Sequence, residues 1–385
     1  MHYSIPSRQP PVLTAADNNN SAHGIVTHCA VTHGHTRFTL GHSPMQTIYT
    51  DLHHDKVEPA LVSVISSLTQ VAKDIALCVR QGALAGILGS AQRENVQGET
   101  QKKLDVIAND LIKTALLQNS AVRALASEEE EQVVAATAGA PYVVAFDPLD
   151  GSSNIDINGQ IGTIFTVYPA LSQLAADSPA HFYQQGKQQV CAGYVLYGAA
   201  TLLVISTGGA TRCYTLDSQS NEFVLTNGKL AVPQCTQEFS INMSNQRFWG
   251  GNMQRYIADL LQGESGARGL RYNMRWNAAM VGDVHRVLTR GGIFMYPSDN
   301  RNAKQPAKLR LLYEANPMAM LIENAGGKAC SEARDEIQRI LDIEPQSLHQ
   351  RVPVILGSAN EVKVCVTYLL KEPAVVFDVD VTDEA

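Results

Sequence analysis

The segment VVAFDPLDGSSNID, residues 143–156, combines residue types that could bind a metal ion and a phosphate. An apolar strand is predicted to end at Asp147, and Asp150 follows it after a short Pro-Leu turn. Two neighbouring carboxylates repel each other unless a proton or a cation lies between them, and such hard oxygen ligands suit Mg²⁺. Gly151 and the two serines after it would let N–H groups and hydroxyls reach a phosphate. A capping turn is the alternative interpretation, but the complete string favours a functional site.

Three other acidic segments could supply further groups to such a site. SEEEE, residues 127–131, directly follows a predicted strand, although an acidic run alone is typical of a solvated surface. Glu99 and Asp105 lie just before and at the start of a predicted helix, where an acid can serve only to balance the helix dipole. Glu314 precedes an Asn-Pro pair that opens an apolar helix, where an acid can simply cap the N-terminus. Because residues 127–131 follow the end of a predicted strand, as Asp147 does, a role in the site is favoured for this acidic segment.

The elements that must position these segments are predicted from the spacing of apolar residues, and regular structure is expected to begin at Glu58. Helices are expected at residues 58–77, 104–117, 254–261, 280–289, 313–325 and 361–370. Single strands are expected at residues 121–126, 142–146, 162–168, 292–296 and 352–356. Four closely spaced strands at residues 192–197, 202–206, 211–216 and 223–226 predict an antiparallel meander. This mixture argues for stacked layers of helix and sheet.

Taken together, these segments resemble the class I fructose-1,6-bisphosphatases, within the superfamily of Mg²⁺-dependent, Li⁺-sensitive sugar and inositol phosphatases. The resemblance runs from about Phe38 to Leu370 and is most specific in FDPLDGSSNID (residues 146–156) and KLRLLYEANPMA (residues 308–319). It implies an α/β fold, the layered α/β/α/β/α sandwich of the sugar phosphatases. It also implies hydrolysis of the 1-phosphate of fructose 1,6-bisphosphate by metal-assisted, in-line attack of water, as part of gluconeogenesis.

The resemblance also implies a role for each matching position. Metal ions would be held by Glu128, Asp147, Asp150, Glu314 and the carbonyl oxygen of Leu149, with Glu99 ordering the metal-site loop. Catalysis would involve Glu128 together with Asp105 and Glu129, which would orient and deprotonate the attacking water. The phosphate to be cleaved would lie on Asp150, Gly151, Ser152 and Ser153. The sugar and its remote phosphate would contact Asn242, Trp276, Met280, Tyr296 and Lys308, with Arg275 supplied across a subunit interface.

Two positions depart from the family pattern near the expected remote phosphate. Trp276 and Asn245 each stand where the family usually has a phosphate-binding tyrosine. An indole N–H and a side-chain amide can still donate to an anion. The changed pocket nevertheless leaves room for sedoheptulose 1,7-bisphosphate, whose longer chain moves that phosphate. A dual or sedoheptulose-preferring bisphosphatase therefore stays open beside the fructose enzyme.

The stretch that matches the family's AMP-binding loop also differs. It has the sequence KVEPA at residues 56–60, and Pro141 and Pro169 stand where the family has a lysine and an arginine. Two lost cations remove much of the binding energy for an anion. We therefore expect weak or absent inhibition by AMP.

The composition excludes some classes of function. The chain has 385 residues, 45% of them hydrophobic, which is enough for one large core or two packed ones. Its net charge of −7 and its pI of about 5.9 provide no field that would attract nucleic acid. No uninterrupted apolar run approaches the roughly 20 residues that cross a bilayer, and the seven scattered cysteines are typical of reduced cytosolic proteins. We expect a cytoplasmic protein that binds neither nucleic acid nor membrane.

The sequence divides into three expected parts. Residues 1–36 contain few apolar clusters and several histidines, so we expect a disordered arm, with a metal- or partner-binding module as the alternative. Residues 37–226 would carry the metal and regulatory regions, and residues 227–385 the sugar-phosphate subsite. The implied cofactor is Mg²⁺, two or more ions per subunit, with Mn²⁺ as an alternative, and the implied assembly is a homotetramer that binds a small sugar bisphosphate. A non-catalytic sugar-phosphate sensor is the competing interpretation, and the presence of every matched carboxylate argues against it.

Overall fold

Regular structure begins earlier than the sequence pattern predicts. The structure, a computed structural model, describes residues 45–94, 100–301, 307–333 and 336–370. Within them, α1 (Ile48–His54) precedes α2 (Pro59–Gln81), so the expectation that regular structure starts at Glu58 is wrong. The apolar residues that α1 buries are Ile48 and Leu52, which are too few for a helical period to stand out.

The strand that carries the main motif, β5 (Tyr142–Asp150), lies inside an eight-stranded sheet with the order β10-β9-β8-β7-β6-β5-β3-β4. The other strands are β3 (Val122–Ser127), β4 (Val134–Ala135), β6 (Ile161–Pro169), β7 (Cys191–Tyr197), β8 (Thr201–Ser206), β9 (Arg212–Leu216) and β10 (Phe223–Asn227). β3 runs parallel to β5, whereas the pairs from β5 through β10 are antiparallel. The predicted meander is confirmed as β7 to β10. β5 continues past its predicted end to include Asp147 and Asp150.

A second sheet follows in the chain, with six strands in the order β12-β11-β13-β16-β14-β15. Its strands are β11 (Glu238–Ser240), β12 (Asn273–Met274), β13 (Ile293–Tyr296), β14 (Lys328–Ala333), β15 (Glu336–Arg339) and β16 (Val354–Gly357). The sequence pattern predicts β13 and β16 but misses the others, because β11 and β12 are very short and β14 and β15 contain many polar residues. β1 (Ser90–Glu94) and β2 (Thr100–Lys102) form a separate antiparallel pair.

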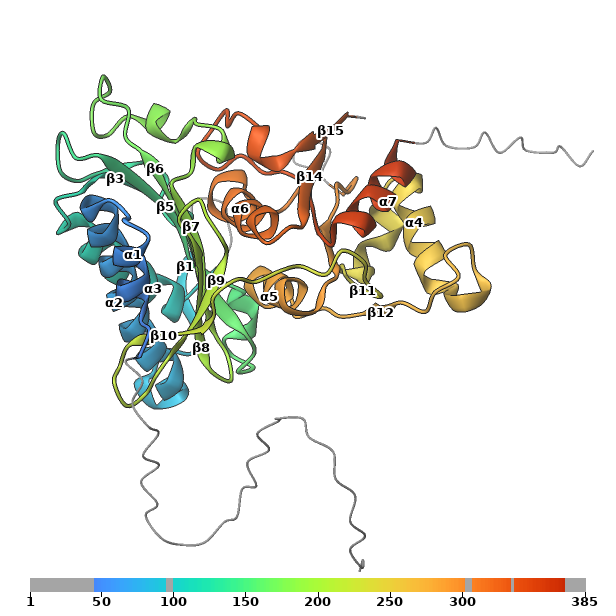
Figure 1. Cartoon of the computed structure of the whole chain (residues 1–385), viewed down its shortest axis with the longest axis horizontal. Helices are drawn as coiled ribbons and strands as arrows, with labels where there is room; N and C mark the ends of the chain where they lie inside the picture. The colour runs from blue at the N-terminus through green and yellow to red at the C-terminus, as the bar shows by residue number, and fades with distance from the viewer. Residues whose placement is uncertain (1–44, 95–99, 302–306, 334–335, 371–385) are drawn as a thin grey trace, which may run out of the picture. The chain divides into compact units, whose positions relative to one another are not determined.

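Helices lie on both sides of each sheet (Figure 1). α1, α2 and α3 (Lys103–Leu117) cover one face of the eight-stranded sheet. α5 (Met280–Arg290) and α6 (Asn316–Asn324) lie between the two sheets, and α4 (Gly251–Leu261) and α7 (Ala359–Leu369) cover the outer face of the six-stranded sheet. The layers therefore follow the order helix, sheet, helix, sheet, helix, and the predicted α/β/α/β/α sandwich is confirmed.

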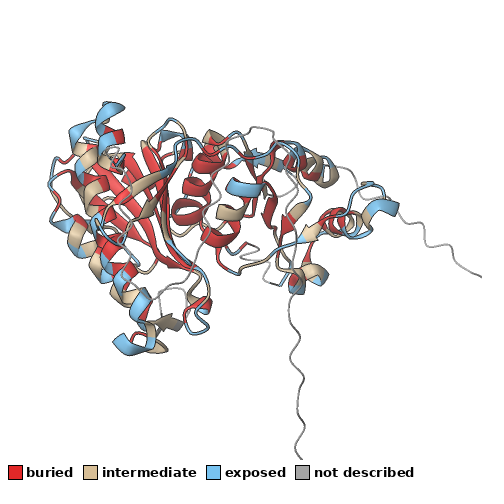
Figure 2. Ribbon diagram, turned by 60° about the horizontal axis from the view of Figure 1, so that its bottom comes forward, coloured by how far each residue is buried: buried red, intermediate tan, exposed pale blue. Residues whose placement is uncertain are grey.

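Many strands of the two sheets are buried, as their red colour in Figure 2 shows. Successive side chains of a strand point to opposite faces, so each sheet can bury both of its faces. On β7, Val195 packs in the core beneath α2, whereas Tyr194 and Leu196 pack in the core of α5 and α6. On β13, Phe294 packs in that central core, whereas Ile293 and Met295 pack with α4 and α7. Strands that are buried on both faces appear as continuous apolar runs, which is why the sequence shows them clearly.

α2 is long and apolar. With the turn that follows it, it spans Pro59–Ala85, and its 27 residues would allow it to cross a bilayer by length and composition alone. Half of the most apolar 18-residue stretch of this segment is buried inside the fold. Val64 and Ile65 pack in the same core as Phe165 of the eight-stranded sheet. We therefore assign α2 as a core helix.

The helix predicted at residues 313–325 begins with an irregular turn. Leu311–Ala315 forms a π-helical turn, and α6 continues from Asn316. Turns of this kind are rare and often occur at functional sites. Glu314 lies inside the turn, so its carboxylate is placed by irregular backbone rather than by a regular helix.

Candidate active site

The carboxyl ends of two parallel strands bring acidic residues together. β3 and β5 pair up to Ser127 and Phe146, and the N–H of Glu128 donates to the carbonyl oxygen of Phe146 at 3.1 Å. Glu128 therefore lies beside Asp147, which follows Phe146 on β5. Both carboxylates are buried. The sheet thus places two acids side by side in an environment that disfavours their charge.

The turn after β5 depends on a glycine. Gly151 has a φ of +87°, in the left-handed region that favours glycine. A Cβ at this position would lie 2.6 Å from the Cβ of Ala279, just before α5. Ser152–Asn154 then forms one 3₁₀ turn. Only a glycine lets this loop, which would hold the phosphate, approach the start of α5 so closely.

Asp105, on the first turn of α3, supports the same loop from behind. Its carboxylate accepts hydrogen bonds from the hydroxyl of Ser152 and from the N–H of Lys102, both at 2.8 Å. Burial raises the pKa of Asp105 to about 6, the charge of Glu129 acts in the same direction, and the two hydrogen bonds oppose the shift. Asp105 and Glu129 are therefore two interacting acids next to the loop.

The π-helical turn brings Glu314 and Arg310 to the strand ends. The carboxylate of Glu314 accepts a hydrogen bond from the N–H of Arg310 at 2.7 Å. The buried guanidinium of Arg310 places Nη1 2.6 Å from a carboxylate oxygen of Glu128 and 3.9 Å from one of Glu314. Arg310 thus neutralises part of the negative charge that gathers here.

Three buried carboxylates converge closely enough to share a cation. Asp147, Asp150 and Glu314 each offer an oxygen, and these oxygens lie within 4.8 Å of one another. Burial raises the pKa of Asp150 and of Glu314 to about 7 each, and burial together with the neighbouring carboxylates raises the pKa of Asp147 well above its usual range. Buried carboxylates that repel each other need a cation to remain charged. The donor set of carboxylate oxygens fits Mg²⁺.

These acids line one part of a cavity of about 320 Å³. Another part of its lining comes from the second half of the chain and contains Asn242, Trp276, Met280, Tyr296 and Lys308. The ring of Trp276 lies parallel to that of Phe294, with the centroids 6.2 Å apart and an interplanar angle of 2°. The cavity therefore joins an acidic region to a region with aromatic walls and an exposed lysine.

Most of the residues predicted from the sequence meet in this cavity. Its lining includes Glu128, Asp147, Leu149, Asp150, Gly151, Ser152, Ser153, Asn242, Trp276, Met280, Tyr296, Lys308 and Glu314. Asp105 and Glu129 are not in the lining; Asp105 accepts a hydrogen bond from Ser152, and Glu129 lies near enough for its charge to raise the pKa of Asp105. Arg275 is exposed, and its Nη1 donates to the carbonyl oxygen of Met274 at 2.9 Å. Glu99 and the arm expected at residues 1–36 lie outside the described residues.

Sequence reasoning missed two charged residues of the lining, Arg310 and Asp283. Arg310 lies four residues before Glu314 in KLRLLYE, a spacing at which opposite charges meet in a helical segment and which could have indicated it. Asp283 had no such signal, because an acid in the first turn of a helix is common. Asn245 is buried behind the cavity, where it lines a narrow void with Tyr296.

Two family profiles match the chain in succession. The N-terminal domain of fructose-1,6-bisphosphatase matches residues 36–228, and the C-terminal domain matches residues 232–370. The chain belongs to the fructose-1,6-bisphosphatase family. The resemblance inferred from the sequence motifs is thereby confirmed.

Individual members of the fructose-1,6-bisphosphatase family are similar over nearly the whole described chain. The class 1 enzyme of Cellvibrio japonicus is 67% identical over 327 residues, covering 85% of this chain and 100% of the relative. That of Saccharophagus degradans is 64% identical over 325 residues, covering 84% and 100%. Among solved structures, the holo form of Leishmania major fructose-1,6-bisphosphatase has a TM-score of 0.78 at 38% identity, covering 84% of this chain and 98% of that one.

We expect this chain to bind Mg²⁺ more tightly as the pH rises through about 7, because the carboxyls of Asp150 and Glu314 must lose their protons to become ligands. Raised carboxyl pKa values also mean that the metal-free folded chain binds more protons than the unfolded chain. Its stability should therefore fall as the pH rises from about 4 to about 7. Thermal unfolding with Mg²⁺ and with chelator, at a series of pH values, measures both effects.

The exposed Lys308 provides the control for this measurement. Lys308→Ala leaves all three converging carboxylates in place and should keep the pH-dependent gain from Mg²⁺, moved to somewhat higher pH because the charge of Lys308 helps to lower the pKa of Glu314. If the gain in melting temperature were the same at about pH 5 and at about pH 8, the carboxylate cluster would not be the metal site.

Proposed function

We propose that this chain hydrolyses the 1-phosphate of fructose 1,6-bisphosphate to give fructose 6-phosphate and phosphate. The observation that carries the proposal is a single cavity that holds a convergent carboxylate cluster, a glycine-serine loop and an aromatic, lysine-bearing region. Relatives named fructose-1,6-bisphosphatase align along their full length. The first two features suit the phosphate that is cleaved, and the third suits the sugar and its remote phosphate.

The chain's own groups divide the work at the phosphate to be cleaved. Mg²⁺, or Mn²⁺ in its place, would supply positive charge for the phosphoryl and leaving oxygens and would acidify the attacking water. The residues that would hold it are Glu128, Asp147, Asp150, Glu314 and the carbonyl oxygen of Leu149. Ser152 and Ser153 hold the phosphoryl oxygens, and the hydrogen bond from Ser152 to Asp105 fixes the loop against the acid pair. Asp105 and Glu129 orient the water and accept its proton.

The remote region of the cavity sets which sugar fits. Trp276 forms a flat wall against Phe294, and the ring of Tyr296 lies at 50° to the indole. Asn242, Met280 and Lys308 complete the proposed sugar subsite. Because an indole N–H replaces the phenol that the family usually has here and so changes the donor that meets the remote phosphate, sedoheptulose 1,7-bisphosphate is the second candidate substrate.

The purified protein should release phosphate rapidly from fructose 1,6-bisphosphate with Mg²⁺, and excess chelator should abolish the release, because the carboxylate cluster alone repels the substrate. A parallel assay with sedoheptulose 1,7-bisphosphate measures the preference between the two sugars. If the indole allows both substrates to bind, Trp276→Tyr should shift the ratio of their turnover towards fructose 1,6-bisphosphate. No release from either sugar by a folded protein that binds Mg²⁺ would contradict the proposal and favour the sugar-phosphate sensor.

Asp105→Asn and Glu129→Gln should each lower kcat by about 10²- to 10⁴-fold, because each amide keeps its shape but cannot accept the proton. Both variants should keep the thermal stabilisation by Mg²⁺. Asp110→Asn, an exposed acid on the same helix, is the matched control and should leave kcat unchanged. Near-normal turnover by either variant of the pair, with metal still bound, would show that the pair is not the base.

We propose that the assembly is a cytoplasmic homotetramer in which Arg275 serves a neighbouring subunit. Arg275 is exposed, and the nearby Leu270 and Met274 are 41% and 39% exposed. Arginine with apolar side chains is typical of a surface that another subunit buries. The six described cysteines are all free, which supports a reducing compartment. We also propose that residues 37–226 supply the metal region and residues 227–385 the sugar region, with residues 1–36 as a separate arm.

A second cavity, of about 810 Å³, lies beside the stretch that matches the family's AMP loop. Its lining includes two acids, Asp55 and Glu58, beside the cations Lys56 and Arg212. The hydroxyl of Tyr142 donates to the carboxylate of Glu58, and the guanidinium of Arg212 pairs with Asp55 at 2.6 Å. Of the two cations that could bind a nucleotide phosphate here, Arg212 is paired with an acid and Lys56 directly follows Asp55 in the chain.

We expect AMP to inhibit weakly or not at all, because prolines stand at two positions where the family has cations. Pro141 directly precedes Tyr142 at the start of β5, and Pro169, at the end of β6, pairs with Tyr142 across the sheet. Inhibition assays over a wide range of AMP concentrations measure this. The double variant Pro141→Lys/Pro169→Arg returns both charges and should bind AMP more tightly than its parent. Potent, micromolar inhibition of the unchanged chain would contradict the prediction.

A further inference from the structure

The loop between β12 and α5 connects the sugar region of the cavity to the loop proposed to hold the phosphate. It carries Trp276, which lines the cavity, and Ala279, whose Cβ limits the space at Gly151. At its centre lies Asn277, both of whose backbone polar atoms are held by side chains from other segments. We call this arrangement, formed by Asp283, Asn277 and Asn154, the Asn277 clamp.

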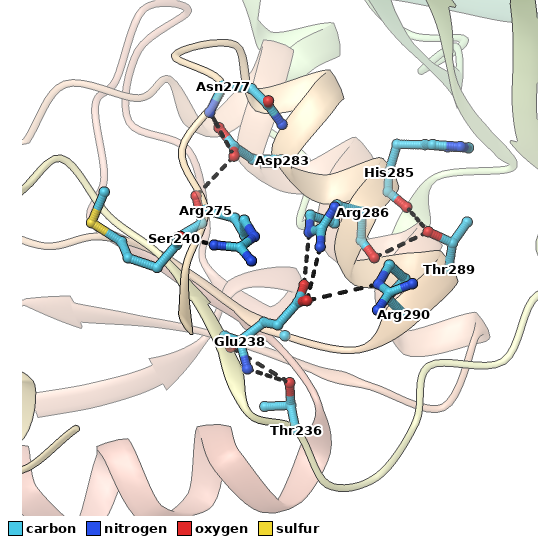
Figure 3. Close-up of polar contacts among 12 residues, drawn as sticks. Thr236, Glu238, Ser240, Arg275, Asn277, Asp283, His285, Arg286, Thr289 and Arg290 are labelled. Atoms are coloured by element: carbon cyan, nitrogen blue, oxygen red, sulfur yellow. Dashed lines mark hydrogen bonds and ion pairs between the residues drawn. The ribbon is translucent and has the colours of Figure 1, made fainter. Parts of the chain in front are cut away.

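Asp283 holds the N–H of Asn277, as Figure 3 shows. The N–H lies 3.0 Å and 3.2 Å from the two carboxylate oxygens, and the hydroxyl of Ser240 donates to the first of them at 2.8 Å. Asp283 is 1% exposed, so it depends on these donors for the solvation of its charge. Arg286, one turn further along α5, makes two hydrogen bonds to Glu238 instead, at 2.7 and 2.8 Å.

Asn154 holds the carbonyl oxygen of Asn277 from the other side. Its Nδ2 donates to that oxygen at 2.8 Å and to the carbonyl oxygen of Gln160 at 2.9 Å. Its own N–H donates to the carbonyl oxygen of Gly151 at 2.7 Å, which closes the turn after β5. One peptide segment is therefore fixed between a buried acid of the central helix layer and the loop proposed to hold the phosphate.

The clamped loop has a conformation that needs support from outside. Ala278 has a φ of +58°, in the left-handed region that is unfavourable for a residue with a Cβ. On one side of it, Trp276 keeps its stacked position, and on the other the N–H of Val281 donates to Asp150 at 2.7 Å. A release of Asn277 would let the indole move relative to the carboxylate cluster.

We propose that Asp283 is a positioning residue for a substrate with two phosphates. By fixing Asn277, it keeps Trp276 and the remote-phosphate region at a set distance from the loop that holds the phosphate to be cleaved. The inference rests on the proposed bisphosphatase function and gives Asp283 no contact with the reacting atoms. An acid that merely stabilised the fold would affect all substrates equally, whereas a positioning residue changes the discrimination between substrates with and without the remote phosphate.

Fructose 1,6-bisphosphate and fructose 1-phosphate differ only in the remote phosphate, so the ratio of their kcat/KM values reports on this region. The ratio should fall about tenfold or more in Asp283→Ala and by less in Asp283→Asn, which keeps one acceptor, mainly through a higher KM for the bisphosphate. Ser240→Ala is the matched control, because it removes the other partner of Asp283 and leaves the bond to Asn277. It should change the ratio by no more than about twofold.

Trp276 provides a readout that does not depend on activity. The chain has two tryptophans, and in a Trp249→Phe background the emission comes from Trp276 alone. Release of the loop should increase the quenching of this emission by acrylamide in Asp283→Asn and Asp283→Ala, but not in Ser240→Ala. Unchanged far-UV circular dichroism shows that each variant is folded.

A lower ratio together with increased quenching supports the proposal. An unchanged ratio with unchanged quenching in the folded Asp283 variants would overturn it, and so would an equal loss of kcat/KM on both substrates. Lys308→Ala separates this result from a failure of the proposed subsite. If that variant also left the ratio unchanged, the assignment of the remote-phosphate region would be wrong, and the quenching of Trp276 would then decide the clamp alone.

Discussion

The mutual repulsion of buried carboxylates at the end of β5 is the constraint on which the rest of the structure depends. Asp147, Asp150 and Glu314 approach within 4.8 Å of one another in a setting where burial already raises their pKa values. Charge in such a place is unfavourable unless opposite charge is near. The guanidinium of Arg310, just before the turn that contains Glu314, supplies part of this positive charge. The remaining charge requires protons or a cation, so metal affinity and stability become one property of the site.

The layers of the sandwich make this concentration of charge sustainable. β3 and β5 run in parallel, so their ends deliver Glu128 and Asp147 to one place, and helices on both faces of the sheet keep water away from it. Two departures from regular backbone geometry lie where the regular elements end. Gly151 adopts a left-handed conformation and Glu314 lies in a π-helical turn. Regular structure supplies rigidity, and these two irregular points aim the functional groups.

Local pattern predicted the elements with clear apolar periodicity. The meander from β7 to β10 and the helices α2 and α3 were visible because their apolar residues repeat at a strand or helix period. α1, β11, β12 and β15 were not, because they are short or polar. The motif around Asp147 and Asp150 predicted a site by itself, whereas the other acidic segments could be assigned to the site only through the family resemblance.

What sequence could not predict is the set of contacts between segments that are distant in the chain. Asn154 and Asn277 are 123 residues apart, and Asp150 and Val281 are 131 apart, yet both pairs are joined by hydrogen bonds. Neither residue type nor spacing indicates such a pair, since each depends on the complete packing of α5 against the eight-stranded sheet.

These two contacts also connect the two regions of the cavity. Burial raises the pKa of Asp150 and the charge of Asp283 adds to this, whereas the N–H groups of Met280 and Val281 oppose the shift and so stabilise the charge that a metal needs. The few residues before that turn carry Trp276 towards the sugar region. A displacement at either region must therefore pass through the same short stretch of backbone, which the Asn277 clamp holds on both sides. The chain between Trp276 and Val281 thus acts as a spacer of fixed length. A substrate with two phosphates binds well when the distance between its phosphates matches the length of this spacer.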